Sequence, residues 1–241
     1  MSAPRFFVAP ADVALTPHSE LALPIAVARH AVQVLRLRDA ASIVVFDGTG
    51  GEYAATLSLR GREAHAVIGA HVDVERESAV ALTLVQALVA HDVMDAIVRK
   101  AVELGVGTIQ PVLAERSQRG PSERLERRAE RWRQIAIAAC EQCGRNRVPA
   151  IEALVPLREW LATRGALQAT ALLDPSADRA LGTPNDAVTT VLVGPEGGFS
   201  EAESADCVRA GAQPRHLGPR ILRADTAALA ALATLGAAHA R

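Results

Sequence analysis

The sequence has few aromatic residues, few cysteines and a single lysine. Aromatic side chains make up 3% of the 241 residues, and only three cysteines occur. Three cysteines cannot pair evenly and are too few for a disulfide-held secreted scaffold, so we expect a reducing compartment. Because Lys100 is the only lysine, arginine supplies almost all of the positive charge.

The chain also lacks a large net charge and a long apolar run. A formal net charge of -1 excludes attraction to polyanions through global charge, although RNA binding needs only a local basic surface. No apolar run reaches the roughly 18 residues of a membrane span, and the first ten residues lack the pattern of a secretory signal. We therefore expect a cytoplasmic globular protein with no membrane span.

The first 72 residues are typical of a small β-barrel. Asp47-Gly48 and Gly50-Gly51 supply the positive φ angles of a tight hairpin, and residues 26–35 have helical periodicity. The expected strands cover residues 6–8, 42–46, 52–59 and 64–71.

After a linker near residues 72–79, apolar strands alternate with amphipathic helices, which predicts a mostly parallel α/β sheet. We therefore predict two domains, residues 1–72 and 73–241. The expected strands are 80–87, 108–113, 169–173 and 188–193, and the expected helices are 92–104, 122–143, 157–163 and 226–239.

The strongest local pattern is residues 191–200, where a buried strand ends in a glycine-rich turn. Ligands of open α/β sheets bind at such carboxyl ends. Ser200 and Glu203 form a capping box that predicts a helix start. An ordinary strand-to-helix turn remains an alternative, and the spacing fits neither the dinucleotide fingerprint nor the phosphate-binding loop.

A second pattern precedes the final helix, where Arg220 and Arg223 flank Ile221 and Leu222 in an expected exposed turn. Aliphatic side chains between charges in a loop indicate that they cover a ligand such as a flat ring. The alternative is that Ile221 and Leu222 fill the core while Asp225 or Thr226 caps the helix.

The helix predicted over residues 122–143 has an apolar stripe through Trp132 and Cys140. Its opposite face carries arginines that either bind phosphates or pair with neighbouring glutamates. Cys140 and Cys143 fall on the apolar stripe, which favours packing, and the histidines show no ligand spacing, so we predict no metal site. The arginines of that face are Arg124, Arg127, Arg128 and Arg131.

Residues 194–199 and 217–223 together closely resemble the bacterial family that methylates N3 of a uridine in small-subunit (16S) ribosomal RNA, part of the SPOUT class. The resemblance continues, in order, through nearly the whole chain. Asp225-Thr226 departs from the usual Glu-Thr of the family, and Cys143 from a common serine. The other matching blocks are Arg29-His30, 34–36, 100–106, 115–117 and 141–145.

This resemblance implies a PUA-like β-barrel for RNA docking and a SPOUT α/β domain with a deep trefoil knot. It further implies a homodimer, 16S rRNA in the small subunit as partner, and S-adenosyl-L-methionine as cofactor. The cofactor's adenosine is expected between residues 172–175, 194–198 and 217–223. The implied cofactor-binding residues are Leu173, Gly194, Pro195, Glu196, Gly198, Leu217, Gly218, Ile221, Leu222, Arg223 and Thr226.

The reaction requires N3 to lie in line with the methyl group, its proton to be removed, and charge on the base oxygens to be stabilised. Arg145 and Arg223 are our hypotheses for the catalytic cations. Methylation of a ribose 2′-hydroxyl or another base, and RNA binding without catalysis, remain alternatives. The predicted RNA-binding residues are Arg29, His30, Arg36, Arg38, Arg116, Arg119, Arg145 and Arg147.

Overall fold

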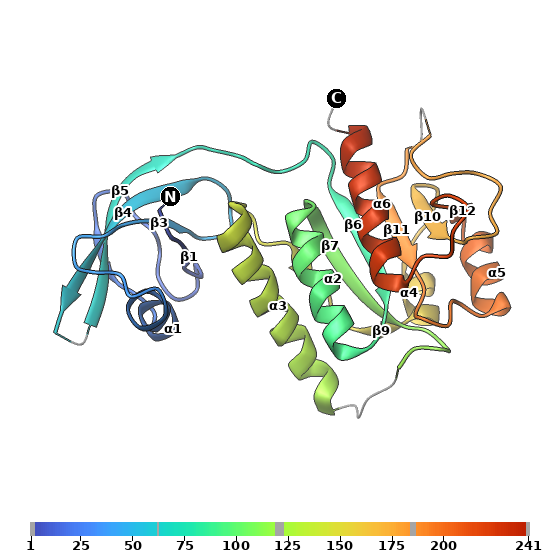
Figure 1. Ribbon diagram of the computed structural model, residues 1–241, viewed down its shortest axis with the longest axis horizontal. Coiled ribbons are helices and arrows are strands. Elements are labelled where there is room, and N and C mark those ends of the chain that lie inside the picture. The colour runs from blue at the N-terminus through green and yellow to red at the C-terminus, as the bar shows by residue number, and fades with distance from the viewer. Residues whose placement is uncertain (1–2, 62, 119–122, 184–186, 240–241) are drawn as a thin grey trace. The chain divides into compact units, whose positions relative to one another are not determined.

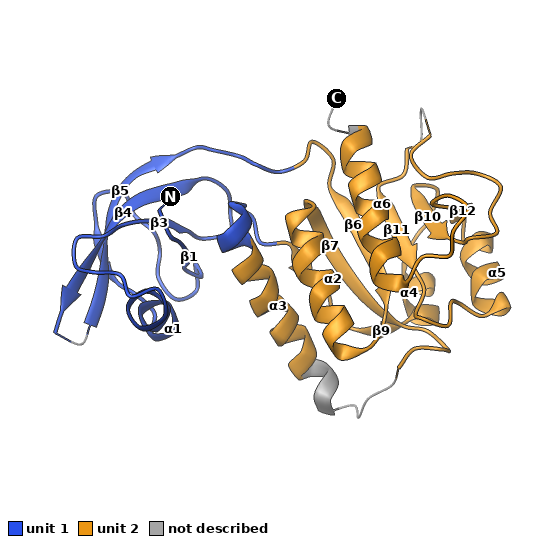
Figure 2. Cartoon of the chain, viewed as in Figure 1, with its two compact units in different colours: residues 1–77, 140–148 blue, residues 78–139, 149–241 orange. Residues whose placement is uncertain are grey.

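The computed structural model describes residues 3–61, 63–118, 123–183 and 187–239. The chain divides into two compact units (Figure 2). Unit 1 comprises residues 1–77 and 140–148, and unit 2 comprises residues 78–139 and 149–241. Unit 1 thus extends past the expected boundary at residue 72 and takes in a segment that the sequence places with the second domain.

Unit 1 is built on a five-stranded sheet with the order β1-β3-β4-β5-β2 (Figure 1). β1 runs parallel to β3 and the other pairs are antiparallel. The hairpin predicted at Asp47–Gly51 joins β3 to β4, and Gly48, Gly50 and Gly51 all have positive φ. The strands are β1 (Arg5–Phe7), β2 (Glu20–Ala22), β3 (Ser42–Phe46), β4 (Glu52–Arg60) and β5 (Glu63–Val72).

The helix predicted over residues 26–35 consists of a short α-helix followed by a π-helix. Helix α1 (Ile25–Arg29) continues directly into a π-helix, η1 (His30–Val34). In η1 the N–H of Leu35 donates to the carbonyl of His30 at 2.9 Å, five residues back. Periodicity does not predict this widening, because a single π-turn is too short to be distinguished from an α-helical turn by its apolar pattern.

Ion pairs and hydrogen bonds hold the linker and residues 144–147 to the rest of unit 1. Arg5 donates to Glu52 at 2.5 Å and to Oδ1 of Asn146 at 2.5 Å. Arg76 donates to the same Glu52 carboxylate at 2.9 Å and to the carbonyl of Gly144 at 3.0 Å. These contacts join residues far apart in sequence, which is why the unit includes a segment that follows the long helix.

Unit 1 should lose stability in acid through Glu52. Burial raises the pKa of Glu52, but hydrogen bonds from Arg76 and Arg5 outweigh it and lower the pKa from 4.5 to about 2. A depressed folded pKa gives stability that is complete above pH 4.5 and is lost as the pH falls towards 2. We expect Glu52→Gln to remove roughly 2 kcal/mol of this pH-dependent stability. Urea unfolding at pH 7 and pH 3 checks it, with Asp12→Asn as the control; parallel pH profiles for wild type and Glu52→Gln would exclude this role.

Unit 2 contains a seven-stranded sheet with the order β12-β10-β11-β6-β7-β8, and β9 also pairs with β7. Every recorded pair is parallel, as the strand and helix alternation predicts. Three short strands, β8, β9 and β12, were not predicted. The strands are β6 (Leu82–Ala87), β7 (Val106–Leu113), β8 (Ala150–Ile151), β9 (Val155–Pro156), β10 (Thr170–Leu173), β11 (Thr190–Val193) and β12 (Gln213–Arg215).

Helices cover both faces of this sheet. α2 and α6 contact each other and strands β6, β7 and β11 (Figure 1). α4 and α5 contribute Trp160 and Cys207 to a buried cluster that includes Val85, Leu172 and Leu192 of the sheet. The helices are α2 (His91–Glu103), α3 (Glu123–Cys143), α4 (Leu157–Thr163), α5 (Glu201–Arg209) and α6 (Ala224–His239).

None of the helices in the described ranges is long and apolar enough to cross a membrane. The predicted start of α3 at Ser122 lies outside the described residues. Within the described part of that helix, Trp132, Ala136 and Cys140 are fully or almost fully buried, as the apolar stripe predicts.

Candidate functional site

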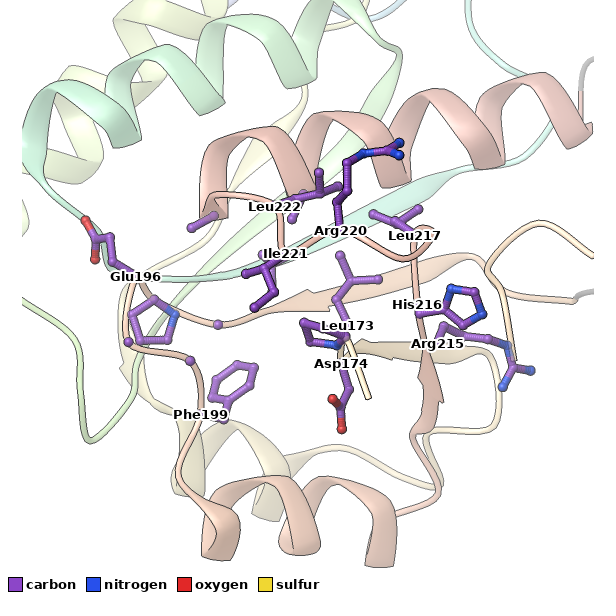
Figure 3. Close-up of a pocket in the computed structure, with 18 residues that line it drawn as sticks. Leu173, Asp174, Glu196, Phe199, Arg215, His216, Leu217, Arg220, Ile221 and Leu222 are labelled. Carbon is purple, nitrogen blue, oxygen red and sulfur yellow. The ribbon is translucent and has the colours of Figure 1, made fainter. Parts of the chain in front are cut away.

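Three neighbouring strands of unit 2, β12, β10 and β11, end at one edge of the sheet. The loop after each strand contributes to a cavity of about 290 Å³ (Figure 3). Asp174 and Pro175 follow β10, residues 194–199 follow β11, and residues 216–217 and 220–222 follow β12. This is the edge at which parallel α/β sheets bind ligands.

The glycine-rich turn after β11 depends on two glycines for different reasons. A Cβ at Gly194 would lie 3.1 Å from the Phe199 nitrogen and 3.3 Å from Gly198 backbone atoms. Gly198 has a φ of 69°, and its N–H donates to the Pro195 carbonyl at 2.9 Å. The turn therefore folds tightly on itself, and Ser200 with Glu203 begins α5 through the predicted capping box.

Contacts from two other elements fix this turn. Glu196 accepts the N–H of Ala90, directly before α2, at 3.0 Å. Arg116, in the loop after β7, donates to the Gly197 carbonyl at 2.9 Å, and Glu203 accepts the N–H of neighbouring Glu115 at 2.7 Å. The turn that lines the cavity is thus held from two sides before any ligand binds.

The loop after β12 presents aliphatic side chains to the cavity. Ile221 is 87% exposed and Leu222 is partly buried, and both line the cavity. The alternative that Ile221 fills the core is therefore wrong. Figure 3 shows Ile221 between the glycine-rich turn and Leu173. A ligand that covers this exposed isoleucine removes apolar surface from water, which favours binding.

The predicted helix cap at residues 225–226 is also wrong. α6 begins at Ala224, so Asp225 and Thr226 lie in its first turn, where the N–H of Thr226 donates to Asp225 Oδ1 at 2.7 Å. The carboxylate is favourable there because the helix dipole is positive at that end.

Most of the expected cofactor residues line the cavity, and three do not. Gly218, Arg223 and Thr226 are absent from its wall, although Gly218 donates its N–H to Nδ1 of the lining His216 at 3.0 Å. Arg223 and Thr226 are exposed. The expected residues that do line the cavity are Leu173, Gly194, Pro195, Glu196, Gly198, Leu217, Ile221 and Leu222.

The cavity also contains residues that the sequence did not single out. Arg215 and His216 belong to it because β12 lies beside β10, and β12 was not predicted. Ala224 and Ala227 line it from the first turn of α6. The alanine-rich sequence of α6 was the available signal, since small side chains leave room for a ligand against the helix.

The predicted catalytic cation Arg145 has a buried ion pair in unit 1. Its guanidinium is bonded to Glu77 through Nε at 2.8 Å and through Nη2, and its side chain is 6% exposed. Arg145 does not line the cavity. Arg147 pairs with Glu75 at 2.6 Å, which raises the pKa of Arg147, yet its side chain is 53% exposed.

Other predicted RNA-binding residues differ in exposure. Arg29, Arg36, Arg38 and Arg116 are exposed, and His30 is half-buried with its ring edge against Phe6 at 5.8 Å. Arg119 lies outside the described residues, and so do the side chains of Arg124 and Leu125 in α3.

The arginine face of α3 is partly engaged within unit 2. Arg131 donates to Asp95 of α2 at 2.8 and 2.6 Å, which raises the pKa of Arg131. This partner lies on another helix, so part of the arginine face is engaged by α2. Arg127 remains exposed and Arg128 is partly buried.

Cys140 is inert in this fold. It is fully buried, and burial raises the pKa of its thiol to about 12. A thiol must ionise to bind metal or attack a disulfide, so the packing interpretation is favoured for Cys140, while Cys143 is only partly buried. Within the described ranges, no three His, Cys, Asp or Glu side chains form a group that could hold a metal ion.

Arg116 should affect ligand binding in the cavity through the turn it holds. We expect Arg116→Ala to weaken binding of a cavity ligand roughly fivefold, because loss of the bond to Gly197 corresponds to about 1 kcal/mol. Calorimetric titration with S-adenosylmethionine measures this. Arg99→Ala, an exposed arginine of α2, is the control. Equal affinity of the two variants would show that Arg116 does not hold the turn.

Comparisons with known proteins match both units. The RNA methyltransferase domain family matches residues 76–236, and the RNA methyltransferase PUA domain family matches residues 26–69. Ribosomal RNA small subunit methyltransferase E of a Synechocystis strain is 32% identical over 97% of this chain and 77% of its own length. The chain belongs to the ribosomal RNA small subunit methyltransferase E family.

Solved structures of this family's fold extend the match over almost the whole chain. The Neisseria gonorrhoeae ribosomal RNA small subunit methyltransferase E, bound to S-adenosyl methionine, is 36% identical with a TM-score of 0.89 and covers 98% of both chains. A Legionella pneumophila methyltransferase in complex with the same cofactor is 30% identical with a TM-score of 0.90, covering 99% of this chain and 98% of that one. The fold is therefore a PUA-like sheet with a SPOUT α/β domain.

Proposed function

We propose that this protein transfers the methyl group of S-adenosyl-L-methionine to N3 of a specific uridine in small-subunit (16S) ribosomal RNA. The observation that carries the proposal is the cavity at the carboxyl ends of β10, β11 and β12, in a chain that belongs to the methyltransferase E family. Two relatives of the same fold were solved with this cofactor.

The residues of the cavity fit the cofactor. Leu173, Leu217 and Ile221 offer aliphatic surfaces for a flat adenine ring, and the turn at Gly194 brings main-chain groups close to a ligand. Asp174 and Glu196 add carboxylates at the wall, which suit a cationic ligand. When bound, the cofactor supplies an electrophilic methyl group on a sulfonium.

The protein's own contribution is to orient the uridine, accept its N3 proton and stabilise charge on the base oxygens. Arg223 and Arg145 remain our candidates for the stabilising cation. Arg223 is exposed directly after the lining residue Leu222, which supports it. Arg145 is engaged with Glu77, so it can serve only by a further N–H of the same guanidinium. A paired uridine must be flipped out to react.

We also propose the division of labour between the domains. Residues 1–72 dock the RNA and residues 73–241 carry out the transfer in the cytoplasm, with a trefoil knot in the catalytic domain. The proposed RNA contacts are the exposed Arg29, Arg36, Arg38, Arg116 and Arg147, together with His30, Arg119 and Arg145.

A homodimer is supported by helix α6. Ala231, Leu232 and Leu235 are buried within unit 2, yet Leu229, Ala230 and Ala233 on its other side are also apolar and only partly covered or exposed. A helix that is apolar all round is normally buried all round. Light scattering of the purified protein tests this, and a monomeric mass at micromolar concentration would contradict it.

The proposed function is tested with separated ribosomal subunits and labelled cofactor. We expect transfer to small subunits or their RNA and none to large subunits. Cofactor binding in calorimetry without transfer to any ribosomal RNA would indicate another RNA target. Absence of cofactor binding would favour an RNA-binding protein without catalysis.

A further inference from the structure

Unit 1 contains a cavity larger than the candidate functional site of unit 2. Its volume is about 720 Å³, which lies within the range of roughly 300–1,000 Å³ typical of ligand sites. One wall is a face of α1 and η1, and the other is formed by β2, β4 and β5. We call it the α1 groove. The lining residues used below are Ile25, Arg29, Val32, Gln33, Leu59 and Glu63.

The helical wall of this groove has one apolar and one polar component. Ile25 and Arg29 of α1 and Val32 and Gln33 of η1 all line the cavity, so they share the face that borders it. Ile25 is 89% exposed and Val32 is 36% exposed. Across the groove, Leu59 of β4 supplies a second aliphatic surface. The groove thus presents aliphatic walls with a guanidinium and an amide between them.

The backbone beside the groove has two strained features, a π-helix and a residue with positive φ, of the kind that clusters at functional sites. The π-helix η1 is followed by Arg36 at a φ of 54°, a conformation that costs a residue with a side chain about 1–3 kcal/mol. π-helices of one turn are frequent at functional sites. The result here is that Val34, Leu35 and Arg36 are all exposed next to the groove.

The charges around the groove favour a polyanion. Arg29, Arg36 and Arg38 are exposed, and in the described part of the chain no carboxylate makes an ion pair with any of them. Glu63 is the acidic residue of the wall, and its carboxylate lies 3.3 Å from Nε2 of His65. Three arginines without acidic partners are available for phosphates.

We propose that the α1 groove binds an unpaired nucleotide of the RNA substrate. The base lies between the lining residues Ile25, Val32 and Leu59, and Gln33 contacts a base edge. Arg29 of the groove, with the exposed Arg36 and Arg38 that follow η1, holds the flanking phosphates. RNA-binding proteins recognise single-stranded bases by stacking on aromatic rings or arginine guanidinium planes combined with side-chain hydrogen bonds, and in this groove Arg29 is the group that can stack. The inference rests on the proposed function, because that function makes RNA the substrate.

The kinetic test places a charge in the groove and a matched charge outside it. We expect Val32→Asp to raise the KM for small-subunit RNA at least tenfold, while kcat and the dissociation constant of S-adenosylmethionine stay within twofold of wild type. Val67→Asp is the control, since Val67 of β5 is 45% exposed and does not line the groove. An unchanged KM for Val32→Asp, or equal losses in both variants, would overturn the proposal.

A second measurement separates the groove from the catalytic function. A photoreactive benzoylphenylalanine replaces Val32, and the protein is irradiated with small ribosomal subunits. We expect a crosslink to RNA that is absent when the same residue replaces Val67. A crosslink to a ribosomal protein, or none, contradicts an RNA site. This readout needs no methyl transfer, so an inactive enzyme that still crosslinks RNA refutes only the proposed function.

Discussion

Ile221→Asp should abolish most cofactor binding without destabilising the protein. Ile221 is 87% exposed in the structure, so its replacement removes no core packing. A cofactor that covers it gains about 2 kcal/mol from the buried aliphatic surface, which corresponds to roughly thirtyfold in affinity. The introduced carboxylate weakens binding further, because covering it with an adenine ring would remove its water. Calorimetry with S-adenosylmethionine measures the loss.

The matched control for this substitution is Val208→Asp. Val208 of α5 is 45% exposed and does not line the cavity. We expect thermal unfolding of both variants to resemble that of wild type, with wild-type cofactor affinity for Val208→Asp alone. If Ile221→Asp bound the cofactor as tightly as wild type, the loop after β12 would not contact it.

Arg145→Ala should have the largest effect on stability. The substitution leaves Glu77 without its guanidinium partner in a largely buried site, and breaking a buried pair in this way costs about 3–5 kcal/mol. Chemical denaturation gives the loss in the free energy of unfolding. Glu77→Ala in the Arg145→Ala background should restore part of that loss, because no unpaired carboxylate then remains.

Arg147→Ala is the control from the same segment. Its ion pair with Glu75 has both side chains substantially exposed and screened by water, so we expect far less loss of stability than for Arg145→Ala. The catalytic hypothesis makes a different prediction, namely a lower kcat at a temperature where Arg145→Ala is still folded. Equal stability of the two variants would show that the bond between Arg145 and Glu77 contributes little to folding.

Local patterns predicted the elements that carry the site. The turn at Gly194 and the capping box of Ser200 and Glu203 depend only on residues close together in sequence. The structure confirms that α5 starts at this capping box. The long strands and helices were found because their periodicity extends over many residues. The short strand β12 was not predicted, since its three residues include Pro214 and its pairing with β10 depends on the fold.

Long-range contacts explain the features that the sequence did not predict. Arg145 was predicted to be an active-site cation, which remains a proposal, but its bond to Glu77 joins residues far apart in sequence and no local pattern predicts it. The exposure of Ile221 likewise depends on what packs nearby, which periodicity does not describe. The π-turn of η1 and the groove beside it arise from one extra residue in a turn and from strands that follow later.

The measurement that tests the central claim most directly is nucleoside analysis after methyl transfer. Purified protein is incubated with labelled S-adenosylmethionine and small ribosomal subunits from cells that lack this gene, and the RNA is digested to nucleosides. We predict label in N3-methyluridine from one site. Label in a 2′-O-methylated nucleoside or in another base, or no label despite cofactor binding, would contradict the proposed reaction.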